Sequence, residues 1–93
     1  MKVEEVISRV AELCRQYDAQ QVILYGSRAK GTALERSDID IAVSGVKDFD
    51  ALSDEVEDLP TLYSVDLLNL DTCMNDLLLE DIRQYGRKIR ETL

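Results

Sequence analysis

The chain has no histidine, only two cysteines and no long apolar run among its 93 residues. Histidine is the commonest general base and the commonest zinc ligand, so acid–base or metal chemistry has to rest on carboxylates here. Carboxylates favour hard ions such as Mg²⁺ over zinc. Cys14 and Cys73 lie far apart and form no CxxC motif, so we expect two reduced, partly buried thiols rather than a disulfide or a metal pair.

No apolar stretch approaches the roughly 20 residues that a membrane span needs. The first ten residues, MKVEEVISRV, are too charged for a signal peptide. We therefore expect a cytoplasmic protein without a membrane segment. A length of 93 residues and an apolar content of 45% are typical of one globular domain, spanning residues 1–93.

Acidic residues outnumber basic ones, and the net charge of −8 is unevenly distributed. Residues 38–81 contain thirteen acidic side chains and one basic side chain, whereas both flanking segments are slightly basic. This distribution argues against binding a long nucleic acid, which requires clustered Lys and Arg to neutralise phosphates. It is compatible with metal binding, with a basic protein partner, or simply with a solvated acidic surface.

The hydrophobic periodicity predicts an α/β or α+β domain in which helices cover a small mixed sheet of about three strands. The expected order is a helix over 3–17, strands over 21–25 and 37–43, a helix over 49–59, a strand over 62–70 and a helix over 78–89. Gly86 weakens the last helix or ends its first part. Four basic residues are expected near the end of that helix, where cations suit the helix dipole: Arg83, Arg87, Lys88 and Arg90.

Three aspartates fall on the polar side of predicted strands. Asp38 and Asp40 are two residues apart, which puts them on one face of a strand with Cα atoms roughly 6.5–7 Å apart. Two such carboxylates repel each other unless a cation lies between them. Taken alone, the pair is as compatible with an acidic exposed strand as with a metal site. Asp66 on the next predicted strand favours the metal site, because a third carboxylate would complete the ligand set or act as a base.

A turn suited to anions precedes these aspartates. Gly26 follows a strand and permits a tight reversal, and Ser27 is a suitable N-cap for a helical turn that begins at Arg28. The free N–H groups of such a turn bind phosphate oxygens, and Arg28 and Lys30 can add positive charge. The stretch GSRAKGT is not a P-loop, since Thr32 occupies the lysine position and no long helix follows.

The turn and the aspartates together predict a site for a nucleoside triphosphate. The triphosphate would lie on the turn, Mg²⁺ would join it to Asp38 and Asp40, and Asp66 would accept the proton of an attacking hydroxyl. Phosphoryl-type transfer depends mainly on positioning and charge neutralisation, so a site without histidine suffices. We expect Tyr25 and Tyr63 to be core or edge residues rather than groups that stack on a base.

The spacing of these residues resembles that of a known family. Gly26-Ser27, ten intervening residues and Asp38-Ile39-Asp40 are similar to the G-S-x10-D-x-D signature of the DNA polymerase beta-like nucleotidyltransferases. The run YGSRAKGTALERSDIDIAV, the VDLL strand and the closing I-R-x-Y-G-R-x-I segment resemble the smallest members, the minimal nucleotidyltransferases. The resemblance implies a palm-like core, ATP and Mg²⁺, with two ions possible, and transfer of a nucleoside monophosphate with release of pyrophosphate.

By position, the resemblance implies that Gly26, Ser27 and Arg28 bind the nucleotide and that Asp38, Asp40 and Asp66 form the catalytic, metal-binding set. Proteins of this kind are typically encoded beside a HEPN-domain toxin. The resemblance therefore implies a hetero-oligomer in which this chain is the antitoxin and adds AMP to a hydroxyl of the toxin, with a tyrosine as the expected acceptor. Two alternatives stay open: an antitoxin that only masks the toxin surface, and an antibiotic-type nucleotidyltransferase whose acceptor domain comes from another chain.

Overall fold

The computed structural model describes residues 2–89, which form four helices and four strands. In chain order the elements are α1 (Val3–Gln16), β1 (Gln21–Tyr25), α2 (Ser27–Lys30), β2 (Ile39–Ser44), α3 (Phe49–Glu57), β3 (Val65–Asn69), α4 (Asp76–Tyr85) and β4 (Arg87–Lys88). Each helix and strand predicted over residues 3–70 is confirmed, although β3 is shorter than the expected 62–70 and β2 begins at Ile39, so that Asp38, expected within this strand, lies just before it. No described helix is long and apolar enough to cross a membrane.

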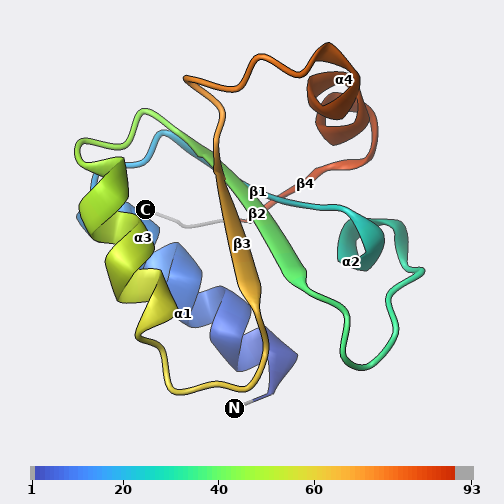
Figure 1. Cartoon of the computed structure of the whole chain (residues 1–93), viewed down its shortest axis with the longest axis horizontal. Helices are drawn as coiled ribbons and strands as arrows, with labels where there is room; N and C mark the ends of the chain where they lie inside the picture. Colours follow the sequence, from blue (N-terminus) through green and yellow to red (C-terminus); the bar gives the residue numbers. More distant parts are fainter. Residues whose placement is uncertain (1, 90–93) are drawn as a thin grey trace.

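The strands form one mixed sheet in the order β3-β2-β1-β4 (Figure 1). β1 runs antiparallel to both β2 and β4, whereas β2 and β3 are parallel. The parallel pair requires a crossover, which α3 supplies. The predicted class, a small α+β domain with helices on a mixed sheet, is therefore confirmed.

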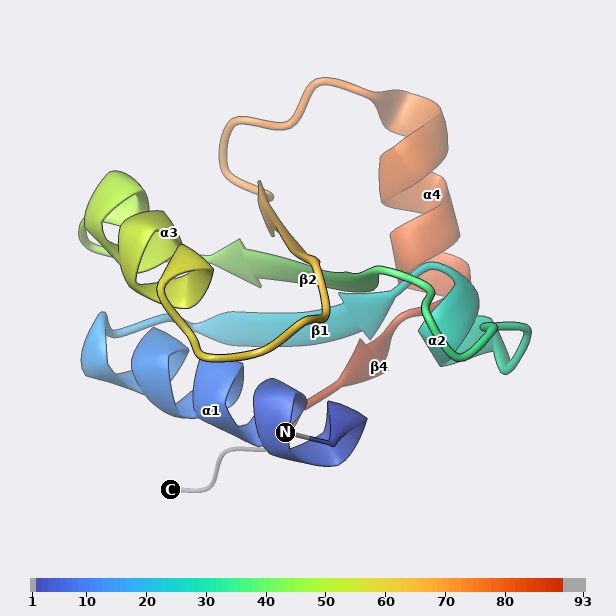
Figure 2. The ribbon, with the colours of Figure 1, turned by 60° about the horizontal axis from the view of Figure 1, so that its bottom comes forward.

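Helices α1 and α3 cover one face of the sheet, and α4 lies against the other (Figure 2). The larger core is on the first face, where the apolar stripes of α1 and α3 meet the inward side chains of β1 and β2. Its fully buried members are Val6, Val10, Cys14, Ile39, Ile41, Val43 and Leu52. The Tyr17 hydroxyl donates a hydrogen bond to Glu55 and so links the end of α1 to α3. Cys14 and Cys73 form no disulfide, as expected.

The second core is smaller and lies beneath α4. Tyr25, Ala42 and Ile82 are its buried members, and partly buried residues of β1, β3 and α4 pack against them. This face is covered by one helix rather than two (Figure 2). The predicted site lies on the same face, where Asp40 is partly buried and Asp66 is exposed.

The prediction of a helix over 78–89 is wrong over residues 86–89, although the expectation that Gly86 could end its first part is confirmed. α4 ends at Tyr85, and Gly86 is followed by the short strand β4, which pairs with β1. Arg87 and Lys88 therefore lie on an edge strand rather than at a helix end, and Arg90 lies outside the described residues. The Ile89 N–H donates to the Val22 carbonyl at 2.8 Å. Ile89 thus packs against the core on the α1 face, although its spacing from Ile82 is also compatible with a helix.

Gly86 has no room for a side chain. A Cβ atom there would lie 2.3 Å from the Ile82 carbonyl oxygen and 2.6 Å from a methyl carbon of Ile23. We predict that Gly86→Ala lowers the free energy of unfolding by about 2 kcal/mol, because the backbone of α4 or β4 must shift to relieve the overlap. Urea denaturation measures the change. Gln84→Ala, at an exposed position of the same helix end, is the control and should change stability by about 0.5 kcal/mol or less. Equal stability of the two variants would contradict this account of Gly86.

Candidate active site

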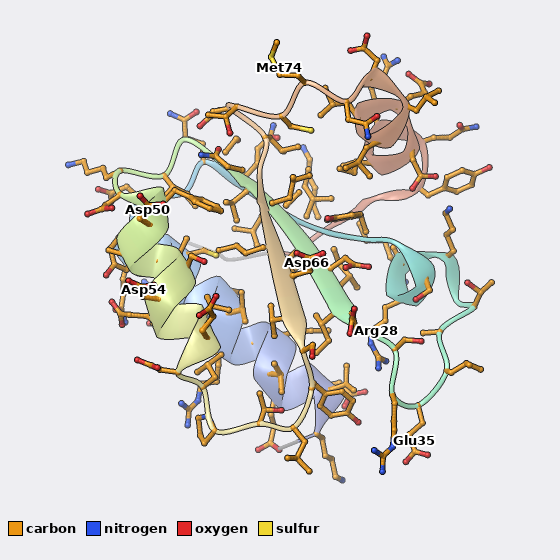
Figure 3. All side chains as sticks on the ribbon, in the orientation of Figure 1. Arg28, Glu35, Asp50, Asp54, Asp66 and Met74 are labelled. Atoms are coloured by element: carbon orange, nitrogen blue, oxygen red, sulfur yellow. The ribbon has the colours of Figure 1, made fainter. Side chains whose placement is uncertain are left out.

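Three polar side chains form a row across the open face of the sheet. The β1–β2 register pairs Tyr25 with Asp40, and the β2–β3 register pairs Asp40 with Asp66. Partners in register share a face, and neighbouring strands lie roughly 4.8 Å apart. The alternation in the sequence predicted Asp66 on the polar side of its strand, and the register of the structure places it beside Asp40. Figure 3 shows Asp66 on the side of β3 that faces β2 and α2. Asp38 is exposed and directly precedes β2.

The three carboxylates interact electrostatically. Partial burial raises the pKa of Asp40 above its usual range, and the negative charges of Asp66 and Asp38 raise it further. Burial also raises the pKa of Tyr25 to about 12, with the charges of Asp40 and Asp66 adding to the effect. Tyr25 therefore keeps its proton at neutral pH, as a buried core residue beside the acidic row.

The Gly26 turn is packed directly against Asp40. Gly26 has a φ of 74°, and a Cβ atom built on it would lie 2.3 Å from an oxygen of the Asp40 carboxylate. Only glycine allows both this backbone conformation and this approach. The two halves of the sequence motif, ten residues apart between Ser27 and Asp38, are thus in contact through Gly26 and Asp40.

The helical turn begins one residue earlier than predicted. Gly26 is the N-cap, and Ser27, expected to be the cap, is the first residue of α2 and makes no side-chain cap hydrogen bond. The Ala29 and Lys30 N–H groups both donate to the Gly26 carbonyl at 3.1 Å. The N–H groups before them lie at the start of the turn, where a helix has no internal acceptors to offer.

The two basic side chains of the turn contact the protein itself. The Arg28 Nη2 atom donates to the Ser37 carbonyl at 2.8 Å and to the Glu35 carbonyl at 3.1 Å. Lys30 Nζ pairs with Asp81 on α4 at 3.0 Å and lies over the Tyr85 ring, 5.1 Å from its centroid. Binding of phosphate by Arg28 stays a prediction, and its observed contacts, which the sequence did not reveal, are with the loop before Asp38.

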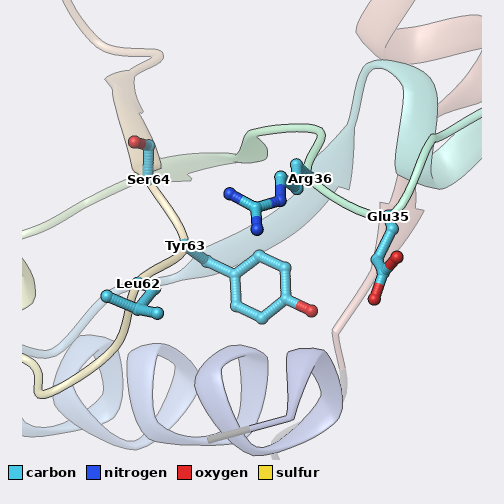
Figure 4. A pocket seen from close by; sticks show the side chains of 5 residues that line it. All are labelled: Glu35, Arg36, Leu62, Tyr63 and Ser64. Carbon is cyan, nitrogen blue, oxygen red and sulfur yellow. The ribbon is translucent and has the colours of Figure 1, made fainter.

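A pocket of about 470 Å³ lies where β2 and β3 begin (Figure 4). Glu35 and Arg36 line one side, and Leu62, Tyr63 and Ser64 line the other. Arg36 is two residues before Asp38, and Ser64 is two residues before Asp66. The pocket is therefore lined by the two segments that lead into Asp38 and Asp66.

Whether the site can bind a hard cation such as Mg²⁺ depends on how Asp38, Asp40 and Asp66 are arranged. Carboxylates on one face of the sheet are suitable ligands for Mg²⁺. Within residues 2–89, however, no three acidic, histidine or cysteine side chains are close enough together to hold an ion. Burial and then the charges of Asp66 and Asp38 raise the pKa of Asp40. The repulsion between these charges opposes closer approach of the three carboxylates, and a divalent cation would offset it. The ligand set of Asp38, Asp40 and Asp66 thus stays a prediction.

Residues 8–92 match the family model described as "Polymerase beta, Nucleotidyltransferase". A comparison with curated proteins finds no match. Solved structures with the same fold include a toxin–antitoxin crystallised with AMP-PNP, which has a TM-score of 0.66, 24% identity and coverage of 92% of this chain and 73% of that one.

Two further matches are variants of the toxin–antitoxin MntA–HpeT. One carries two aspartate-to-glutamate substitutions two positions apart; it has a TM-score of 0.63, 20% identity and coverage of 92% of this chain and 73% of that one. The other carries a tyrosine-to-alanine substitution; it has a TM-score of 0.63, 25% identity and coverage of 91% and 72%.

The raised pKa of Asp40 predicts a pH-dependent gain of stability in Asp40→Asn. Folding disfavours the ionised carboxylate, so the native chain loses stability as the pH rises through the ordinary carboxyl range to the higher folded pKa of Asp40. We expect the variant to be more stable by about 0.5–1 kcal/mol at neutral pH, because solvent screening limits the gain, and equally stable at acidic pH. Thermal unfolding across this pH range measures the difference, and a variant that is less stable at neutral pH would contradict the repulsion.

The contact between Gly26 and Asp40 predicts coupled substitutions. Gly26→Ala should cost about 2–3 kcal/mol, from its positive φ and from displacing the Asp40 carboxylate. In an Asp40→Ala background the cost should fall by about 1 kcal/mol, because the overlap with the carboxylate is gone and the strain in φ remains. A double-mutant cycle by urea denaturation measures the coupling. Strictly additive costs would mean that the two residues do not constrain each other.

Proposed function

Because the chain belongs to the polymerase beta nucleotidyltransferase family, we propose that it transfers AMP from ATP to a hydroxyl group of a protein toxin and thereby acts as its antitoxin. One observation carries the proposal: Asp40 touches the Gly26 turn on one side and neighbours Asp66 on the other. A turn that offers backbone N–H groups thus lies directly beside a pair of carboxylates. Such a pair of features suits a triphosphate and its metal ion.

Each part of the site has a task in this reaction. Gly26 and Ser27 hold the triphosphate through the backbone at the start of α2. Asp38, Asp40 and Asp66 would hold Mg²⁺, which supplies charge neutralisation on the phosphates and activation of the attacking oxygen. Gly26 lets the nucleotide and the Asp40 carboxylate come close, because no Cβ intervenes.

The proposed step is a displacement at the α-phosphorus of ATP. The acceptor oxygen forms a bond to that phosphorus, the bond to the oxygen that bridges to the β-phosphorus breaks, and pyrophosphate leaves. Asp66 takes the proton of the acceptor hydroxyl. Asp66 is the exposed member of the row, on the outer strand β3, so an acceptor on another protein can reach it.

The partner follows from the same considerations. The similar structures are of toxin–antitoxin assemblies, and one of them contains the nucleotide analogue AMP-PNP, which supports a toxin partner and an ATP-like donor. In another, the two substituted aspartates are spaced as Asp38 and Asp40 are, which supports a role for this pair. We infer a HEPN-type toxin as the acceptor, with tyrosine as the modified residue, in a hetero-oligomer whose acidic member is this chain.

A second function is favoured by one observation. The three carboxylates of the described chain do not form a ready metal cluster, which is compatible with a site that turns over slowly or not at all. In that case the chain would neutralise the toxin by masking its surface. The two functions differ in whether ATP and the aspartates matter.

The aspartates provide the test. We predict that Asp38→Asn and Asp40→Asn each lower AMP transfer by roughly 100-fold or more, because both the metal and the triphosphate lose an anchor. Asp66→Asn should lower it by roughly 100-fold through loss of the base. The measurement is the intact mass of the toxin encoded beside this chain after incubation with the chain, Mg²⁺ and ATP.

The matched control is Asp54→Asn, which makes the same charge change at an exposed position on α3, away from Asp66 (Figure 3). It should leave transfer unchanged. If the Asp38 and Asp40 variants neutralise the toxin fully without ATP and no mass gain occurs with the native chain, the masking function replaces the catalytic one.

A further inference from the structure

Arg28 lies where three segments of the site meet. It belongs to α2, which starts at the Gly26–Ser27 turn; its guanidinium reaches the loop that ends at Asp38; and it lies over the ring of Tyr63, three residues before Asp66. We propose that Arg28 and Tyr63 form a clamp that positions Asp38 and Asp66 relative to the turn. Arg28 is then a positioning residue rather than a phosphate ligand, and this inference rests on the proposed function.

The first contact of the clamp is with the loop. Arg28 Nη2 and Nε donate to the Ser37 carbonyl at 2.8 and 3.3 Å, and Nη2 also donates to the Glu35 carbonyl at 3.1 Å. The Ser37 carbonyl is half of the peptide group whose other half is the Asp38 N–H. Holding that oxygen therefore holds the backbone from which the Asp38 carboxylate projects.

The second contact is with the segment before β3. The Arg28 guanidinium carbon lies 5.4 Å from the centroid of the Tyr63 ring, within the range of a cation–π interaction. Tyr63 in turn packs against the larger core, which fixes the ring. The next residue, Ser64, accepts a hydrogen bond from the Ile39 N–H at 2.9 Å, so this segment and the start of β2 are joined directly.

Only arginine satisfies all of these contacts at once. Its planar guanidinium presents donors in one plane to the carbonyls and a flat face to the aromatic ring. Lysine keeps the positive charge but offers neither the fork nor the face. A phosphate ligand has different requirements, because an ammonium group binds phosphate well as a point charge. Arg28→Lys therefore separates the two roles.

The clamp has a kinetic signature. Loosening it leaves the Gly26–Ser27 turn intact but lets two of the three carboxylates drift, and a misplacement of about 1 Å can cost roughly 100-fold in rate. We expect Arg28→Lys and Tyr63→Leu each to lower kcat for AMP transfer by roughly tenfold or more, while KM for ATP changes by less than about threefold. Tyr63→Phe keeps the ring and should retain most of the activity.

Hydrogen exchange provides a readout that does not depend on transfer. The amides of residues 34–38 should exchange roughly tenfold faster in Arg28→Lys and Tyr63→Leu than in the native chain, whereas Tyr63→Phe should exchange at the native rate. Arg9→Lys, at an exposed position of α1, is the matched control for the arginine change. If the native chain transfers no AMP, the proposed function fails, but hydrogen exchange still decides whether the clamp exists.

Two results would overturn the clamp. A tenfold rise of KM for ATP with unchanged kcat in Arg28→Gln, together with native behaviour of Arg28→Lys, would identify Arg28 as a phosphate ligand. Native exchange rates in both Arg28→Lys and Tyr63→Leu would show that the loop and the β3 segment are held by other contacts.

Discussion

The parallel pairing of β2 with β3 places two carboxylates side by side on an open face of the sheet, and the rest of the site depends on this arrangement. Asp40 is half-buried between Tyr25 and Asp66, so burial and the neighbouring negative charges raise its pKa and make its ionisation cost free energy. The same side is where a triphosphate can reach the Gly26 turn. The charge repulsion and the proposed nucleotide site therefore involve the same two carboxylates, Asp40 and Asp66.

The groups that lie next to these carboxylates are mainly backbone groups. Gly26 touches the Asp40 carboxylate, and the start of α2 supplies N–H groups, whereas the two cations of the turn are engaged elsewhere. Arg28 holds the loop before Asp38, and Lys30 pairs with Asp81 and joins α2 to α4. Both basic side chains of the turn thus contact neighbouring segments of the protein.

Much of this could be predicted from local pattern. Alternation along residues 37–43 identified the face of Asp38 and Asp40, and the same alternation placed Asp66. Gly26 was recognisable because a tight reversal after a strand requires it. The last helix was predicted too long, because Ile82 and Ile89 are seven residues apart and this spacing also fits the apolar stripe of one continuous helix. The contacts of Arg28 could not be predicted either, because a basic residue beside a glycine turn gives the same sequence pattern whether it binds a phosphate or a backbone carbonyl.

The sequence by itself determined which residues face which side of each element, because hydrophobic period and turn chemistry are local properties of the chain. It thereby determined the order of elements up to β3 and the residues of the candidate site. Only the tertiary structure decided that β3 pairs with β2 in the register that joins Asp66 to Asp40, and that the chain after Gly86 forms a strand paired with β1. It also decided that Arg28 faces the loop. Each of these depends on segments distant in sequence meeting in space, where steric fit and hydrogen-bond partners, rather than local preference, select the outcome.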